Sequence, residues 1–462
     1  MNFFTGLWGR FRELLFPQAV VEREFGVHPA TSLSMEKNIG LWYALYTDTP
    51  PWEDCDVKPL GIPSAICKEV ARPVLVEFEA TISGSQRADW LMEQFTAASE
   101  HFKRALEVGL ALGGVCFKPY IYDDRLLVDV TSAAAFQPTK FDPSGTCIGG
   151  VFRDKPVRIG KDWYIRLESH MLDNGIYTVR NKAYHSDSSG TVGAAAELAE
   201  VPEWADIPPE VTIEGMTGPL FAYFKPPIAN TADPSSPCGM SIFGDKATIE
   251  LLKQADQQWE QLRWEFKSSE RKVFMEGNTG IAEMFNERMF EFGNFSPDGN
   301  FFQNIEPNVR DDAFYRGFQN ILRRIEFNVG LSYGDISDPQ TVEKTATEIR
   351  NGKQRKYVLV DSIQKALEHT FDALVYAMDV YATLYGLAPA GGYEVTYDWG
   401  DSILDDQDTK DKEFARDLQL TSAGIMNDWE LRAKYFAEDE VTAKANLPKA
   451  EDMTTEPEGE VE

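Results

Sequence analysis

Residues 330–349 of the chain read GLSYGDISDPQTVEKTATEI. Gly330, Gly334 and Pro339 predict a loop here, because glycine tolerates turn conformations and proline interrupts a helix. Apolar residues recur at helical spacing before this loop, over 310–329, at Phe314, Phe318, Ile321, Ile325 and Val329. The longest helical pattern of the chain follows over roughly 343–386, with a stripe made of Val360, Ile363, Leu367, Phe371, Leu374, Met378, Tyr381 and Tyr385. The loop is therefore predicted to join two helices.

Another helix is predicted upstream, over 243–270. Its apolar residues alternate at spacings of three and four, at Leu252, Ala255, Trp259, Leu262 and Phe266. The segment 271–309 then interrupts the helical pattern with Gly277, Gly280, Gly293, Pro297, Gly299 and Pro307. Downstream of the long helix we predict a short strand at Tyr393–Trp399 and more helix over 407–445. The tail after Pro448 holds six acids and one lysine and is predicted to be disordered.

The first half of the chain mixes helix and strand patterns, so the predicted fold class is α+β. One helix is predicted over 87–109, ended by Gly113 and Gly114. Two hairpins are predicted, Val115–Tyr122 with Arg125–Thr131 around Asp123-Asp124, and Trp163–His170 with Ile176–Tyr184 around Asp173-Asn174-Gly175. Eight prolines between 202 and 237 predict an extended connection, because proline lacks a backbone donor. The N-terminal residues favour an amphipathic docking helix over a membrane-surface helix or a signal peptide.

The charge of the chain limits the kinds of partner that it can grip. Its net charge is −29, from 74 acids and 45 bases. Proteins that hold nucleic acid tightly usually present a basic stripe to the phosphates, and this composition does not favour one. No apolar run approaches the roughly 18 residues needed to span a membrane.

Motifs of catalysis and metal binding are missing from the sequence. There is no phosphate-binding loop, nucleophile elbow, HExxH motif or dinucleotide fingerprint, so we expect no enzyme and no cofactor. Cys55, Cys67, Cys116, Cys147 and Cys238 lack metal-site spacing and are predicted to be free, buried thiols. For His170 and His185, packing on strands is favoured over catalysis. The acids Asp398, Asp401, Asp405, Asp406 and Asp408 favour a solvated helix start, with a hard-cation site as the alternative.

The segment 330–349 resembles the signature of portal proteins from siphophages of Gram-positive hosts, in which a Gly-Leu-Ser-type loop leads into Lys-Thr-Ala-Thr-Glu and a long helix. Further similar stretches are Leu167–His170 with Tyr177–Asn181, Gly239–Phe243 and Val395–Asp401. The similarity extends from about residue 30 to 440. It implies a ring of twelve subunits at one capsid vertex, through which double-stranded DNA is packaged and later ejected.

The resemblance also implies a map of the chain. Residues 1–240 would form the wing, 241–270 and 310–330 the two stem helices, 271–309 the clip and 331–342 the tunnel loop. A long wing helix and a late strand would occupy 343–406, a helical crown 407–447 and an acidic disordered tail 448–462. Tunnel-loop residues at the DNA channel would be Gly330, Ser332, Tyr333, Gly334, Asp335 and Lys344. Clip residues in contact with terminase or connector would be Met284, Phe285, Met289, Phe290 and Phe292.

Partners follow from the same resemblance: copies of the chain, DNA, the terminase large subunit, scaffold, major capsid protein and a head-completion connector, with no membrane. The implied location is the virion, reached from the host cytoplasm. A channel wall rich in carboxylates would repel phosphate and let DNA slide. The alternatives are another phage head component, such as a minor capsid or scaffold-associated protein, and an acid-pair hydrolase.

Overall fold

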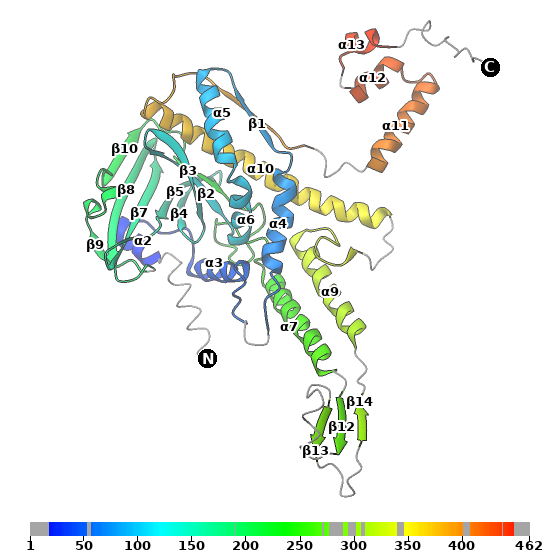
Figure 1. The fold of residues 1–462 in the computed structure, drawn as a ribbon. Coiled ribbons are helices and arrows are strands. Elements are labelled where there is room, and N and C mark those ends of the chain that lie inside the picture. The colour runs from blue at the N-terminus through cyan, green and yellow to red at the C-terminus, as the bar shows by residue number, and fades with distance from the viewer. Residues whose placement is uncertain are drawn as a thin grey trace, which may run out of the picture. The chain divides into compact units, whose positions relative to one another are not determined.

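The computed structural model describes residues 18–52, 57–189, 191–269, 272–276, 290–293, 302–305, 310–339, 346–400, 407–436 and 438–447. The chain divides into two units, Met1–Trp399 and Gly400–Glu462. The described residues form a mixture of helices and mainly antiparallel sheets, which confirms the predicted α+β class (Figure 1). Among the described helices, none combines the length and the apolar character needed to cross a membrane.

The N-terminal part of the first unit contains five described helices. They are α2 (Gln18–Phe25), α3 (Leu33–Tyr46), α4 (Ile62–Leu75), α5 (Gln86–Ser99) and α6 (Phe102–Leu112). The prediction of one helix over 87–109 is wrong, since α5 and α6 are separate. The backbone N–H of His101 donates to the Ala98 carbonyl, only three residues back. The Ser99 hydroxyl donates to the Thr96 carbonyl. This tight turn ends α5 before α6 begins.

Both predicted hairpins are present. β2 (Val115–Tyr122) and β3 (Arg125–Ser132) turn at Asp123 and Asp124, whose φ angles are 51° and 58°. β7 (Asp162–Asp173) and β8 (Ile176–Ser186) turn at Asn174 and Gly175, with φ of 50° and 80°. Positive φ at both central residues is the conformation of a tight hairpin turn, which aspartate, asparagine and glycine tolerate best.

Each hairpin belongs to a larger antiparallel sheet. β11 (Ala222–Phe224) adds to the first, in the order β11-β2-β3. The second sheet runs β10-β8-β7-β5-β4, with β4 (Phe136–Phe141), β5 (Cys147–Arg153) and β10 (Glu210–Glu214), while β6 (Val157–Ile159) pairs with β7 and β9 (Ala194–Ala196) with β8. The proline-rich stretch supplies β10 and β11, both at sheet edges, where a missing backbone donor is tolerated. Two short 3₁₀ turns, Leu198–Glu200 and Pro202–Trp204, precede β10.

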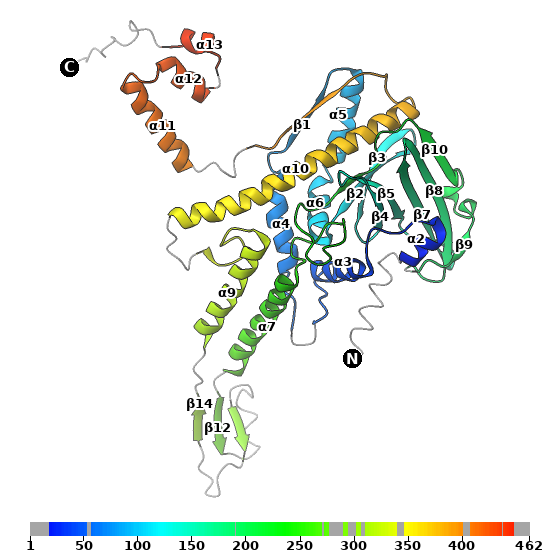
Figure 2. The same ribbon diagram turned by 180° about the vertical axis from the view of Figure 1, so that it is seen from behind.

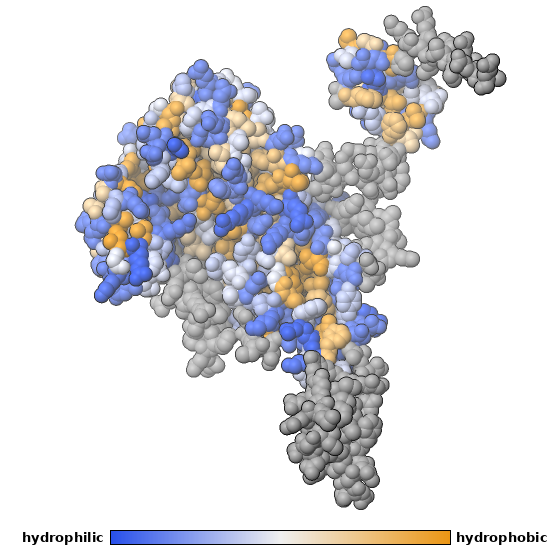
Figure 3. Space-filling view, in the orientation of Figure 1, coloured by the Kyte–Doolittle hydropathy of each residue, from blue (hydrophilic) through white to orange (hydrophobic). Residues whose placement is uncertain are grey.

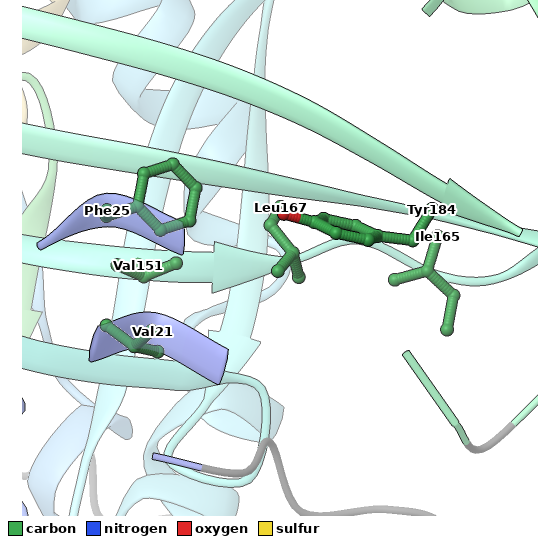
Figure 4. Close-up of a cluster of buried hydrophobic side chains, with 6 residues drawn as sticks. All are labelled: Val21, Phe25, Val151, Ile165, Leu167 and Tyr184. Carbon is green, nitrogen blue, oxygen red and sulfur yellow. The ribbon is translucent and has the colours of Figure 1, made fainter. Parts of the chain in front are cut away.

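Helix α2 is held against the larger sheet by apolar packing. Val21 and Phe25 of α2 lie in one buried cluster with Val151 of β5, Ile165 and Leu167 of β7, and Tyr184 of β8 (Figure 4). Cys67, Cys116, Cys147 and Cys238 are free and buried elsewhere in this unit, as predicted, while Cys55 lies outside the described residues.

The long helix α10 (Ala346–Leu384) returns to this α/β region, where it packs on β2, β11, α4 and α5 (Figure 2). Its buried Phe371 stacks on Phe102 of α6 with ring centroids 4.5 Å apart. After α10, β15 (Glu394–Asp398) pairs antiparallel with β1 (Glu79–Ser83), about three hundred residues away in sequence. The predicted long helix and late strand are therefore both confirmed, and both belong to the same core as the N-terminal helices.

The second unit consists, in its described part, of α11 (Gln407–Ser422), α12 (Asp428–Phe436) and α13 (Glu440–Ala445). The helical content predicted for 407–445 is present, interrupted near Gly424, whose φ is 71°. Asp417 of α11 joins α12, because its carboxylate accepts hydrogen bonds from Lys434 and Tyr435. The predicted tail, 448–462, lies outside the described residues.

Candidate functional site

Two helices form an antiparallel pair, α7 (Lys246–Ser268) and α9 (Asp311–Val329) (Figure 1). At one end, Arg310 before α9 donates two hydrogen bonds, of 3.1 and 3.0 Å, to the Glu265 carboxylate near the end of α7. At the other end, Asn328 of α9 donates to the Thr248 hydroxyl of α7 at 3.2 Å. Both helices occupy the ranges that the sequence predicted.

The middle of the pair is apolar. Leu252 and Leu262 of α7 and Leu322 and Ile325 of α9 are buried. The rings of Trp259 and Phe318 lie 5.4 Å apart across the pair. Apolar packing in the centre and polar contacts at both ends fix how the two helices align.

The chain between these helices forms a small sheet. Its strands are β12 (Lys272–Glu276), β13 (Phe290–Gly293) and β14 (Phe302–Ile305), in the order β13-β12-β14. β13 runs parallel to β12 and β14 runs antiparallel to it. Of the predicted clip residues, Phe290 and Phe292 lie on β13 and pair in register with Val273 and Met275, whereas Met284, Phe285 and Met289 lie outside the described residues.

The loop after α9 folds back onto the last turns of that helix, with Glu326 as its anchor. The Glu326 side chain is fully buried, and one carboxylate oxygen accepts from the backbone N–H groups of Gly334, Ile336 and Ser337 at 2.8–3.0 Å. Its second oxygen accepts from the Ser337 hydroxyl at 2.8 Å. Four hydrogen bonds to one buried carboxylate attach this loop to α9.

Further contacts secure both ends of the loop. Gly330 ends α9 with φ of 83°, a left-handed conformation that glycine adopts without strain. The Gln319 side chain accepts from the backbone N–H of Asp338 at 2.7 Å. Asp335 accepts from the backbone N–H of Ser332 and pairs with Lys356 of α10 at 3.1 Å.

The structure thus brings five of the predicted tunnel-loop residues into one fastened turn, namely Gly330, Ser332, Tyr333, Gly334 and Asp335. Tyr333 is the most exposed of the large side chains in this turn, with 40% of its surface accessible. Lys344, the sixth predicted residue, lies outside the described residues. The role of the loop in a channel stays a prediction.

Glu326 and Gln319 are the residues that the sequence analysis missed. Both are buried polar side chains on α9, at positions where the helical stripe of Phe318, Leu322, Ile325 and Val329 calls for apolar residues. An acid on the apolar stripe of a predicted helix could have indicated the anchor of the loop. A buried carboxylate requires hydrogen-bond donors around it, and these must come from another part of the chain.

The excess negative charge of the chain does not lie on the helix pair. α7 carries four acids and four bases, and α9 carries three of each. Residues 400–462 carry 18 acids and seven bases, and so account for −11 of the net −29. If the pair faces DNA, its formally neutral helices provide no general repulsion of phosphate.

A second polar cluster lies between β2 and β7 in the larger α/β region. Lys118 pairs with Glu168 at 2.7 Å, and Arg166 pairs with Asp154 at 2.6 Å. His170 lies between the Glu168 carboxylate and the Tyr177 hydroxyl, 2.7 Å from each, and is fully buried. Two bases, two acids and the buried imidazole form one connected polar network, in line with the packing role favoured for His170.

This network predicts a dependence of stability on pH. Burial lowers the pKa of His170 below its ordinary value of 6.5, so the native state resists protonation while the unfolded chain accepts the proton. The free energy of unfolding is expected to fall on acidification from about pH 6.5, by at most about 1.4 kcal/mol per pH unit for one proton.

Urea unfolding at fixed protein concentration between pH 7.5 and 5.5 measures this slope. The variant His170→Gln has no imidazole to titrate there and should show a flatter slope, whatever its absolute stability. An equal slope in both proteins would assign the pH dependence to other groups.

Within the described residues, no three histidine, cysteine or acidic side chains are placed to hold a metal ion. Asp398 lies on β15 and Asp408 in the first turn of α11, where acids favour a helix start, while Asp401, Asp405 and Asp406 are outside the described residues.

A scan against models of known protein families finds no match to this chain, and a search of curated proteins finds none either.

Proposed function

We propose that the chain is the portal subunit of a tailed bacteriophage, one copy in a ring that surrounds a channel for double-stranded DNA. The observation that carries the proposal is the antiparallel pair α7–α9 with a small sheet inserted between its helices, followed by a fastened loop and the long helix α10. This order of parts corresponds to stem, clip, stem, tunnel loop and wing helix, as the resemblance of 330–349 implies.

The surface of the helix pair supports assembly into a larger particle. Trp264 and Phe266 are 63% and 52% exposed near the end of α7, and Phe327 is 48% exposed near the end of α9, at the opposite end of the pair. Figure 3 shows hydrophobic residues gathered over α7 and α9. Large aromatic side chains are enriched at protein–protein contacts relative to the rest of a protein surface. A cyclic assembly would cover them with copies of the same chain.

The proposed role is structural and not catalytic. The ring would receive DNA from a terminase motor at its clip, hold the capsid vertex together with scaffold and major capsid protein, and later bind a connector. It would act in the virion after assembly in the host cytoplasm.

Negative-stain imaging of the purified chain tests this function. We expect ring-shaped particles with a central opening, because subunits joined head to tail around an axis enclose a hole. Compact particles without an opening would instead favour another head component or an enzyme. ATP turnover that disappears on changing one residue of this chain would also contradict the structural role.

A further inference from the structure

An open apolar groove of about 370 Å³ runs along one side of the α7–α9 pair. Its lining includes Ile62 and Ala65 of α4, Trp259 of α7, Leu322 of α9, Ile336 of the loop, and Glu69 at one edge. The groove therefore offers apolar walls contributed by four separate parts of the chain. Its two ionisable lining residues, Glu69 and Asp335, are both acidic.

The opposite side of α9 carries a cation–aromatic cluster, which we define as Arg324, Phe327, Tyr333 and Arg355. Phe327 follows Phe318 by nine residues, which is half a rotation beyond two full turns of an α-helix, so the two rings point to opposite sides of α9. The Arg355 guanidinium lies over the rings of Phe327 and Tyr333, 5.1 and 4.8 Å from their centroids. Arg324 lies 5.1 Å from the Phe327 ring.

This cluster is incomplete within one copy of the described structure. Phe327 and Tyr333 are 48% and 40% exposed although each is a large ring. The Nη1 atom of Arg355 is buried and has no hydrogen-bond acceptor among the described residues. The cation that a partner can reach is Arg324, which is exposed beside the exposed Phe327 ring, so the cluster is suited to a partner that brings both apolar surface and a carboxylate.

We propose that the cation–aromatic cluster of one copy docks in the groove of the next copy. The partner is thus a second copy of this chain, and the inference rests on the proposed ring. A ring needs two different, complementary faces on each subunit. The groove and the cluster are such faces, since one is apolar with acidic edges and the other aromatic with basic edges.

Glu69 is the acid best placed to accept from the incoming cations. In the single copy it pairs at 3.1 Å with Arg72, whose side chain is 62% exposed, and exposed pairs exchange partners at little cost. The Asp335 carboxylate, the other acid of the groove, already pairs with Lys356 and accepts a hydrogen bond from the backbone N–H of Ser332. Phe327 lies five residues beyond Leu322 along α9. For Phe327 of one copy to meet Leu322 of the next at the same height in the ring, α9 must be inclined to the ring axis.

Charge reversal tests the contact. Arg324→Glu and Glu69→Arg should each raise the protein concentration needed for ring formation by about tenfold, equivalent to 1.4 kcal/mol. The double variant should restore much of the loss, because the reversed charges again attract. Arg104→Glu, an exposed position on α6 with the same change in charge, should have little effect.

A disulfide between Phe327→Cys and Ala65→Cys, in a chain with Cys55→Ser, locates the contact directly. Oxidation should link neighbouring copies into a ladder that ends at the closed ring. Rings that form without this ladder, with Arg324→Glu behaving like Arg104→Glu, would overturn the inference and leave the ring proposal intact. A disulfide closed within single copies would overturn it as well. A wild-type chain that forms no ring would instead contradict the proposed function.

Discussion

Replacing Glu326 with alanine is expected to lower the free energy of unfolding by about 3–5 kcal/mol. The substitution removes the acceptor of three backbone N–H groups and one hydroxyl, all next to a fully buried position. Each buried donor left without an acceptor costs about 1–3 kcal/mol, and partial relaxation of the loop reduces the sum. Urea unfolding followed by circular dichroism measures the change.

Two further variants make the Glu326 prediction specific. Glu326→Gln keeps one oxygen acceptor and should lose roughly half as much stability. Glu250→Ala changes an exposed glutamate on α7 and should stay within about 0.5 kcal/mol of wild type. If Glu326→Ala were no more harmful than Glu250→Ala, the loop would not depend on this carboxylate.

Replacing Arg87 with alanine is the second change with a large expected effect, again about 3–5 kcal/mol. Arg87 of α5 is 2% exposed and donates to the carbonyls of Asp379, Ala388 and Pro389 at 2.9–3.1 Å. It also pairs with the Asp379 carboxylate at 3.3 Å. These contacts bind the end of α10 to the N-terminal helices, so their loss should loosen the long helix.

Lysine at this position should not rescue the protein. Arg87→Lys retains the charge, but a single ammonium cannot span three separate carbonyls as the planar guanidinium does. Arg104→Ala, at an exposed position of α6, is the matched control and should remain close to wild type. The thermal melting temperatures of Arg87→Ala, Arg87→Lys and Arg104→Ala rank the stability of the three variants. Equal melting temperatures for Arg87→Lys and wild type would contradict the role given to the guanidinium.

The sequence predicted those elements whose signal is local. Asp-Asp and Asn-Gly turns identified both hairpins, because few residues accept positive φ at two successive positions. The long helices α7, α9 and α10 were found because each keeps an apolar stripe over several turns. The small sheet between α7 and α9 was expected only as a break in the helical pattern.

Other parts could not be read from local patterns. α4 contains Pro63 in its first turn and Pro73 near its end, and the prolines obscured a helix that tertiary packing stabilises. The separation of α5 from α6 depends on one tight turn at Ala98–His101. The cation–aromatic cluster depends on contacts between α9, the loop and α10, which no sequence spacing reveals.

The mass of the purified particle in solution tests the central claim most directly. Light scattering should be recorded in moderate salt, because subunits with a net charge of −29 repel one another when screening is weak. A ring subunit predicts one closed species whose mass is a large integer multiple of 52.0 kDa, with twelve copies implied by the family resemblance. A particle that remains at 52.0 kDa at high concentration and moderate salt would contradict the assignment.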